Sequence, residues 1–228
     1  MSICMAVVGA GRMGSVVAAQ LPKRTQKIII DMDFSKACRL ADKVEGIPSD
    51  SLESAGKADL VAVVLPTPVV NETVDKLLNI AKKGAIILNM ATAAHIDPVF
   101  IEKRKEISIV DAKILGHAMS ISRGEPGIIV VKCNDESKFN LIKDQLAGFY
   151  QVVQGEADLV EKINKIGSTE GIRAAVAVRK QLLELNVPYK WIDVAIRTVC
   201  AGTMKSFVEN DLGHFALELA KNMDKEMV

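Results

Sequence analysis

Aromatic side chains are scarce in this chain of 228 residues, with one tryptophan, two tyrosines and six phenylalanines. So few rings form no series of stacking surfaces for the bases of a single-stranded nucleic acid. An excess of one charge sign is also lacking, because 29 Lys and Arg residues face 28 Asp and Glu residues, a formal net charge of +1. This balance gives no electrostatic case for a nucleic-acid partner or for an anionic membrane surface.

Cysteine clusters, metal-ligand spacings and long apolar runs are missing too. The four cysteines are widely separated and contain no C-x-x-C pair, which predicts reduced thiols in a cytoplasmic protein. The three histidines stand in no spacing with acidic residues that indicates a metal site. No apolar run reaches the roughly 18 residues of a membrane span, and the N-terminus lacks the basic region of a signal peptide. We therefore expect a cytoplasmic protein with no membrane partner and no metal.

A glycine-rich turn lies close to the start of the chain. An apolar run at residues 3–8 leads into it, and a helix-like run at 12–21 follows. In a G-x-G-x-x-G turn the first glycine permits the tight turn, the second lets the backbone approach a pyrophosphate, and the third lets helix pack on strand. The helix N-terminus adds free N–H groups and a partial positive charge. The sequence therefore predicts a dinucleotide site formed by Gly9, Ala10, Gly11, Arg12, Met13 and Gly14.

Asp31 follows the second apolar strand and is placed to accept hydrogen bonds from the ribose hydroxyls of adenosine. A carboxylate at this position repels a 2′-phosphate, so NAD is the preferred cofactor. Arg12, Lys36 and Arg39 lie nearby in the sequence and can relieve that repulsion, so NADP remains an alternative. The other interpretation of Asp31 is that it only caps the turn at residues 33–35.

Short apolar runs alternate with helix-length segments as far as residue 153. This pattern predicts an α/β fold with a Rossmann-type doubly wound, mostly parallel sheet. Strands are expected at residues 3–8, 27–30, 59–65, 84–90, 107–112, 127–132 and 149–153. Helices are expected at residues 12–21, 34–44, 69–82 and 135–146, with a short helix beginning at 97.

From residue 154 the sequence is helical almost to the end. The first helix, at 159–185, is roughly 40 Å long, and helices at 191–209 and 212–221 follow it. We expect a dinucleotide-binding domain at 1–153 and a small all-helical dimerisation and substrate domain at 154–228. So thin a domain buries little apolar surface alone, so a homodimer through these helices is expected. The alternative is a monomer whose helices fold back onto the sheet domain.

Several segments resemble the family of 3-hydroxyisobutyrate and 6-phosphogluconate dehydrogenases. The turn G-A-G-R-M-G is similar to the family's G-x-G-x-M-G, and Leu65-Pro66 is similar to the Leu-Pro that ends the family's strand beside the nicotinamide. Residues 84–92 resemble the pattern G-a-i-v-v-D-x-S-T. Residues 110–112 with Gly116, and Gly124 further on, resemble the substrate-loop pattern D-A-P-V-S-G-G, which gives a substrate loop at 111–124. The resemblance covers roughly residues 3–166. It implies an NAD(P)-dependent oxidoreductase that transfers a hydride between nicotinamide and a small hydroxy or oxo acid.

The chain departs from that family at the positions that contact substrate. Ala91 stands where the family usually has a serine that hydrogen-bonds the substrate, and Leu115 and His117 replace a serine and a glycine of the substrate loop. Lys162 is the closest match to the family's general acid/base lysine. Other residues occupy the positions of the asparagines that accompany that lysine, and Asn164 is expected about 200° away from Lys162 on the helix.

A second resemblance covers the C-terminal third. Residues 166–171 and 199–204 are similar to the helical dimerisation domain of pyrroline-5-carboxylate reductases, which reduce a cyclic imine. This resemblance implies the same architecture with a different substrate. An imine reductase is therefore an alternative function, and a non-catalytic dinucleotide-binding sensor or assembly protein is another.

Four further residues are candidates for contact with cofactor or substrate. Thr67 and Thr92 follow parallel strands, at the sheet edge where such folds bind ligands, although loop capping explains each hydroxyl equally well. Lys162 is the candidate general acid/base, and His117 in the substrate loop is the alternative acid. A solvated helix face and an ordinary loop histidine are the competing interpretations.

Overall fold

The computed structural model describes residues 3–226. The chain divides into two compact units, Met1–Asn164 and Lys165–Val228. The boundary between them falls within helix α7 (Asp158–Glu184). We describe each unit by itself.

Within the described residues, the first unit is built on one sheet of eight strands in the order β3-β2-β1-β4-β5-β6-β7-β8. All neighbouring pairs are parallel except β6 and β7, so the expected doubly wound, mostly parallel sheet is confirmed. The strands are β1 (Cys4–Val8), β2 (Gln26–Ile30), β3 (Ile47–Ser49), β4 (Leu60–Val63), β5 (Ile86–Asn89), β6 (Ser108–Leu115), β7 (Ile128–Lys132) and β8 (Gln151–Gln154).

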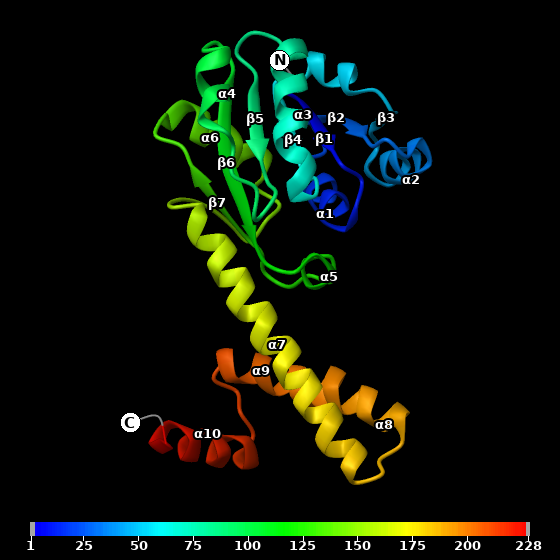
Figure 1. Ribbon diagram of the computed structural model, residues 1–228, viewed down its shortest axis with the longest axis vertical. Helices are drawn as coiled ribbons and strands as arrows, with labels where there is room; N and C mark the ends of the chain where they lie inside the picture. Colours follow the sequence, from blue (N-terminus) through cyan, green and yellow to red (C-terminus); the bar gives the residue numbers. More distant parts are fainter. Residues whose placement is uncertain (1–2, 227–228) are drawn as a thin grey trace. The chain divides into compact units, whose positions relative to one another are not determined.

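Helices cover both faces of this sheet (Figure 1). They are α1 (Arg12–Gln20), α2 (Phe34–Val44), η1 (Leu52–Lys57), α3 (Thr67–Ile80), α4 (Pro98–Lys103), α5 (Ala118–Ile121) and α6 (Glu136–Gln145). Helices α1, α2 and α6 pack their apolar sides on one face, and α3 and η1 pack on the other. Because both faces are covered, β1 and β4 are buried along their whole length, which explains their unbroken apolar sequences.

Three short elements were not predicted by the sequence pattern. Strand β3 has three residues, includes Pro48 and lies at the edge of the sheet, so it has no periodicity to detect. Elements η1 and α5 are also short, with six and four residues. Strand β6 also continues to Leu115, beyond the predicted end at residue 112. A lysine at position 113 interrupts its apolar run, which is why the pattern predicted an earlier end.

The second unit consists of helices joined by short turns within the described residues. After the C-terminal part of α7 come α8 (Tyr189–Val194), the π-helical segment η2 (Ala195–Cys200), α9 (Ala201–Val208) and α10 (His214–Glu226). The helix predicted at 191–209 is therefore present, with a π-helical segment inside it. Between residues 165 and 223 only Ile192 is buried. This unit by itself has almost no hydrophobic core.

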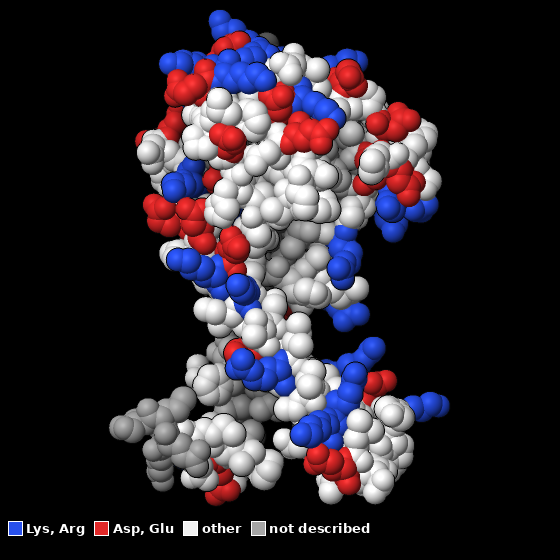
Figure 2. Space-filling view, viewed as in Figure 1, with Lys and Arg blue, Asp and Glu red and all other residues white. Residues whose placement is uncertain are grey.

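No helix in the described part of the chain has both the length and the apolar character of a membrane span. On the face of the first unit that Figure 2 shows, acidic and basic side chains are interspersed, with no large area of one sign.

Candidate functional site

The site is centred on the place where the sheet changes direction. Strands β1 and β4 are neighbours, and the chain continues from them toward opposite edges of the sheet. The turns that follow these two strands are in close contact. Gly9 has φ +107°, and a Cβ built on it would lie 2.4 Å from the Val64 carbonyl oxygen and 3.0 Å from Leu65 Cδ2. In open sheets of this type, ligands bind outside the carboxyl ends of the strands at such a switch point.

Gly14 and Gly11 meet different surroundings although they belong to one turn. A Cβ built on Gly14 would lie 1.8 Å from the Gly9 carbonyl oxygen, so only glycine allows α1 to approach the turn this closely. A Cβ built on Gly11 would have no protein atom within 4 Å. Gly11 also has φ −73°, which any residue can adopt. The fold therefore requires glycine at position 14, whereas at position 11 the missing side chain leaves open space beside the backbone.

The helices that begin at the switch point differ at their N-termini from α2, α4 and α6. Asp33, Asp97 and Asp135 cap α2, α4 and α6 by accepting hydrogen bonds from backbone N–H groups. The caps of α1 and α3 are Gly11 and Pro66, and neither helix has a side-chain cap. The first N–H groups of a helix have no partner inside it. Those of α1 are thus left for water or for an anionic ligand, whereas in α3 Pro68 has no N–H and the Val69 N–H donates to the Pro66 carbonyl at 3.2 Å.

Asp31 ties two turns together beside this point. One carboxylate oxygen accepts the Ala10 N–H at 2.7 Å, and the other accepts the Asp33 N–H at 2.9 Å. A carboxylate has about four lone-pair sites, so two remain for hydroxyl donors. Asp31 thus stabilises the turn at 31–33 and retains the capacity that ribose binding needs. The turn at 33–35, which the capping interpretation assigned to Asp31, is capped by Asp33, whose side chain accepts the Ser35 and Lys36 N–H groups.

A cavity of about 540 Å³ lies between α1 and α2, next to the glycine turn. Its basic residues are Arg12, Lys36, Arg39 and Lys43. Two of them have partners close by, since Lys36 lies 3.5 Å from Asp33 and Arg39 donates to Ser35 Oγ at 3.1 Å. These cations lie on the α1–α2 side of the turn.

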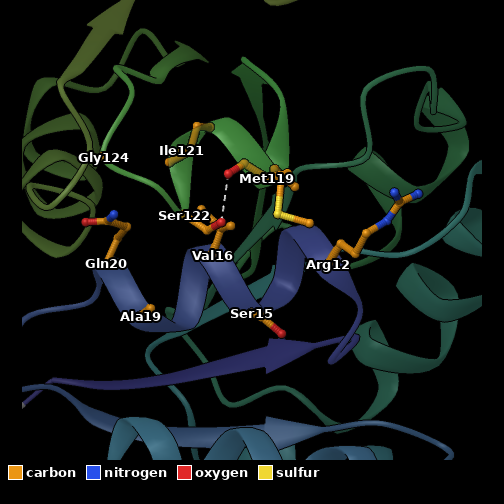
Figure 3. Close-up of a pocket in the computed structure, with 10 residues that line it drawn as sticks. Arg12, Ser15, Val16, Ala19, Gln20, Met119, Ile121, Ser122 and Gly124 are labelled. Atoms are coloured by element: carbon orange, nitrogen blue, oxygen red, sulfur yellow. Dashed lines mark hydrogen bonds between the residues drawn. The ribbon is translucent and has the colours of Figure 1, made fainter. Parts of the chain in front are cut away.

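A second cavity, of about 530 Å³, separates α1 from the loop that contains α5 (Figure 3). Val16 and Ile121 line it as apolar walls, and Ser122 Oγ donates to the Met119 carbonyl at 2.8 Å within the loop. Arg12 lines this cavity as well as the one between α1 and α2. The predicted substrate loop therefore faces α1, the helix that starts at the glycine turn.

The turn after β5 carries Thr92 and is held from several sides. Thr92 is half-buried. The ammonium of Lys113 on β6 lies within hydrogen-bond distance of two carbonyls of this turn, those of Ala91 and Ala94. On the other side, Asn71 of α3 donates to the His95 carbonyl at 3.1 Å and accepts the Asp97 N–H at 3.2 Å.

Lys113 is a titratable group in the interior of the sheet. Burial lowers its pKa below the usual lysine value, and the charge and hydrogen bond of Asp111 offset part of that effect. The carboxylates of Asp158 and Glu161, at the start of α7, act in the same direction as Asp111. His95 bridges toward this helix as well, with Nε2 3.4 Å from Glu161 and Nδ1 3.8 Å from Asp158.

Asn164 is the α7 residue that contacts the predicted substrate loop. Its side chain donates to the Ile114 carbonyl at 2.9 Å and accepts the Gly116 N–H at 3.3 Å. Lys162 is exposed, and so is His117 at the start of α5. Within the described residues, no hydrogen bond joins Lys162 to His117. Thr67 is exposed at the beginning of α3.

Sequence reasoning missed two participants of this region. Helical periodicity places Asn164 on the side of α7 away from Lys162, yet Asn164 is the residue that reaches the loop. Lys113 was not singled out at all, although a charged residue inside a buried strand was the available signal. Both contacts join residues 19 or more positions apart in the sequence, so no local sequence pattern predicts them.

Comparison with solved structures finds the same fold in several dehydrogenases and reductases. A pyrroline-5-carboxylate reductase from Coxiella burnetii is similar, with TM-score 0.71 and 15% identity over 98% of this chain and 85% of that one. A 3-hydroxyisobutyrate dehydrogenase from Salmonella typhimurium has TM-score 0.69 and 18% identity over 99% and 88%. An NAD complex of a semialdehyde dehydrogenase NAD-binding protein from Cupriavidus necator has TM-score 0.66 and 16% identity over 93% and 86%. At these identities the likeness concerns the fold.

The comparison with curated proteins found no match. One protein family, described as the NAD binding domain of 6-phosphogluconate dehydrogenase, matches residues 4–155. The match covers most of the first unit, from β1 to the end of β8, and more than half of the chain. This protein therefore belongs to the family of the NAD binding domain of 6-phosphogluconate dehydrogenase.

Proposed function

We propose that this chain is an NAD(P)-dependent oxidoreductase that transfers a hydride between nicotinamide and a small hydroxy or oxo acid. The observation that carries the proposal is the contrast within the glycine turn. Gly11 leaves open space at the uncapped N-terminus of α1, whereas Gly9 and Gly14 are required by packing. Such an opening is what a pyrophosphate needs to approach backbone N–H groups.

The residues around the switch point fit a nicotinamide dinucleotide along its length. The turn at residues 9–14 would bind the pyrophosphate, and Asp31 would accept from the adenosine ribose. Leu65, Pro66 and the hydroxyls of Thr67 and Thr92 would hold the nicotinamide half. A bound nicotinamide supplies or accepts the hydride.

NAD is the preferred cofactor in this proposal. The Asp31 carboxylate lies beside the Gly9–Ala10 turn and has free lone pairs, so it favours a 2′-hydroxyl and repels a 2′-phosphate. The four cations of the α1–α2 cavity oppose that preference. One of them, Lys36, has its Nζ 3.5 Å from the Asp33 carboxylate, which reduces the positive charge available to a phosphate.

Lys162 is the proposed general acid/base, with His117 as the alternative. Each would hold or accept, on Nζ or on an imidazole nitrogen, the proton that accompanies hydride transfer. Asn164 would fix the substrate loop through its hydrogen bonds with the Ile114 carbonyl and the Gly116 N–H. The loop would then be held at a set distance from the first turns of α7.

Imine reduction is the second candidate function, and one observation favours it. The side chain that contacts the loop is the amide of Asn164, whereas Lys162 is exposed. An amide neither releases nor accepts a proton near neutral pH, so a reaction that needs no lysine at this place fits the arrangement. The solved pyrroline-5-carboxylate reductase has the same fold.

The test is oxidation or reduction of the nicotinamide, followed by its absorbance, across a panel of hydroxy acids, oxo acids and cyclic imines. Turnover of an acid that Lys162→Ala abolishes supports the main proposal. Turnover of an imine that Lys162→Ala leaves intact favours the second candidate. Tight NADH binding with no reaction across the panel contradicts both and leaves the non-catalytic sensor or assembly protein.

We also propose a homodimer formed through the C-terminal helices. The second unit leaves large apolar side chains exposed on each of its helices, among them Ile172, Val176, Trp191, Phe207 and Phe215. Exposed apolar patches of this kind mark interaction surfaces. A second copy presents the same surface and so can cover it symmetrically.

A further inference from the structure

The turn after β5 closes over a buried ammonium group. Lys113 on β6 is 1% exposed. Its Nζ lies 2.6 Å from the Ala91 carbonyl oxygen, 2.8 Å from the Ala94 carbonyl oxygen and 3.3 Å from Asp111 Oδ1. A lysine ammonium has three N–H donors, and here each has an acceptor. The two carbonyls come from the turn, and the carboxylate comes from the lysine's own strand.

Asn89 completes this arrangement from the end of β5. Its amide nitrogen donates to the Ala94 carbonyl at 2.8 Å and to Asp111 Oδ1 at 2.7 Å. Both partners are acceptors, which fixes the orientation of the amide. Its Oδ1 is the one buried side-chain polar atom without a hydrogen-bond partner in the described part of the chain. The turn carbonyls thus point inward at two donors, Lys113 and Asn89, instead of outward at water.

A lysine at this position is not explained by packing. Burying an ammonium group is unfavourable unless it is paired and hydrogen-bonded, and an apolar side chain would fill the same space at lower cost. What lysine supplies here is a charged donor that draws two carbonyls of one turn to one point.

We propose that Lys113 is a positioning residue, whose ammonium holds the turn at 91–94 closed and thereby fixes Thr92 at the nicotinamide end of the site. Thr92 lies between the two anchored residues, Ala91 and Ala94, so its backbone has little freedom while both carbonyls stay bound. The part of this inference that concerns nicotinamide rests on the proposed function. The part that concerns the turn rests only on the contacts of Lys113.

The test compares Lys113→Met with Lys27→Met. Lys27 is also buried, on β2, and its Nζ contacts only the Thr25 carbonyl at 3.4 Å within the described residues, so it is a matched control. Two properties are measured for the full-length chain. One is amide hydrogen exchange of the peptide covering 90–97, and the other is the affinity for NADH and for ADP-ribose, which lacks the nicotinamide.

We expect Lys113→Met to raise exchange at 90–97 by about tenfold or more, with β1 and β4 unchanged. NADH affinity should fall by about tenfold while ADP-ribose affinity stays within about twofold, because only the nicotinamide half meets this turn. Lys27→Met should change neither. Lys113→Gln keeps N–H donors but loses the charge and the length of lysine. It should lower NADH affinity more than ADP-ribose affinity, by a smaller factor than Lys113→Met, and it replaces Lys113→Met in the test if that variant does not fold.

Different results would contradict the role of Lys113 in the turn and its role at the nicotinamide end. Unchanged exchange at 90–97 in the folded variants overturns Lys113 as the anchor of the turn, whatever the cofactor does. Equal losses for NADH and ADP-ribose overturn its role at the nicotinamide end. If wild-type protein binds neither ligand, the proposed function fails, and the exchange measurement still decides whether Lys113 holds the turn.

Discussion

A single added methyl group at Gly11 should reduce cofactor affinity without weakening the fold. Gly11→Ala places its Cβ where no protein atom lies within 4 Å, at φ −73°. Replacing glycine by alanine at a compatible φ stabilises a protein by about 0.4–1 kcal/mol. Losing glycine at a helix N-cap offsets a similar amount. The net change in the free energy of unfolding should therefore be below about 0.5 kcal/mol, a Tm shift of less than about 2 °C.

The same methyl group would stand in the space through which a pyrophosphate reaches the backbone of the turn. Losing one hydrogen bond to a charged group costs about 1.5–3 kcal/mol, which corresponds to an increase of about 10- to 150-fold in the Kd for NADH. Calorimetric titration gives the Kd, and thermal unfolding without ligand gives the Tm.

Gly14→Ala is the matched comparison, three positions along the same turn. Its Cβ would lie 1.8 Å from the Gly9 carbonyl oxygen, so the turn or α1 must move. Overpacking of this kind destabilises by about 1–3 kcal/mol or more, a Tm loss of several degrees. The reasoning is refuted if Gly11→Ala binds NADH as tightly as wild type, or if Gly11→Ala loses as much stability as Gly14→Ala.

Three further predictions concern the cofactor, acid stability and assembly. Asp31→Ala should weaken NADH binding and lower the ratio of NADH affinity to NADPH affinity, measured by competitive titration. If this ratio is unchanged, Asp31 does not recognise the ribose. Burial alone would raise the pKa of Asp59, but hydrogen bonds from the Cys4 N–H and Lys82, together with the charge of Lys82, lower it overall. A carboxylate whose pKa is lower in the folded than in the unfolded state stabilises the folded protein at pH values above its unfolded pKa, about 3.9. This stabilisation is lost as the pH falls through the pKa of the folded state. Asp59→Asn should therefore lower stability in urea unfolding at pH 7, and its difference from wild type should shrink below about pH 4; a difference independent of pH contradicts this. Replacing both Ile172 and Val176 by Asp should convert a dimer into monomers in sedimentation velocity, whereas a wild-type chain that already sediments as a monomer contradicts the homodimer.

The parts of the fold that the sequence predicts are those set by local pattern. Strand β1, the glycine turn and α1 follow from an apolar run, three spaced glycines and an amphipathic segment within the first 20 residues. The long helix α7 follows from continuous helical periodicity, and its observed bounds, Asp158–Glu184, differ by one residue at each end from the predicted ones. Strand β3 is too short for any period, and it exists because the neighbouring β2 supplies hydrogen-bond partners.

The parts of the site that the sequence does not predict depend on pairing between distant segments. Lys113 reaches the turn at 91–94 because β5 and β6 are neighbours, with Asn89 paired to Asp111. Asn164 reaches Gly116 because the first turns of α7 lie against the end of β6. A periodicity argument gives the angle between Lys162 and Asn164 on the helix, but it does not say which side the loop is on.

The most direct test of this account is calorimetric titration of the purified wild-type chain with NADH. We predict saturable binding of one NADH per chain, to a site that Gly11→Ala weakens while the protein stays folded. Absence of binding to a folded protein by both NADH and NADPH would contradict the claim that the turn after β1 holds the linked phosphates of a nicotinamide dinucleotide.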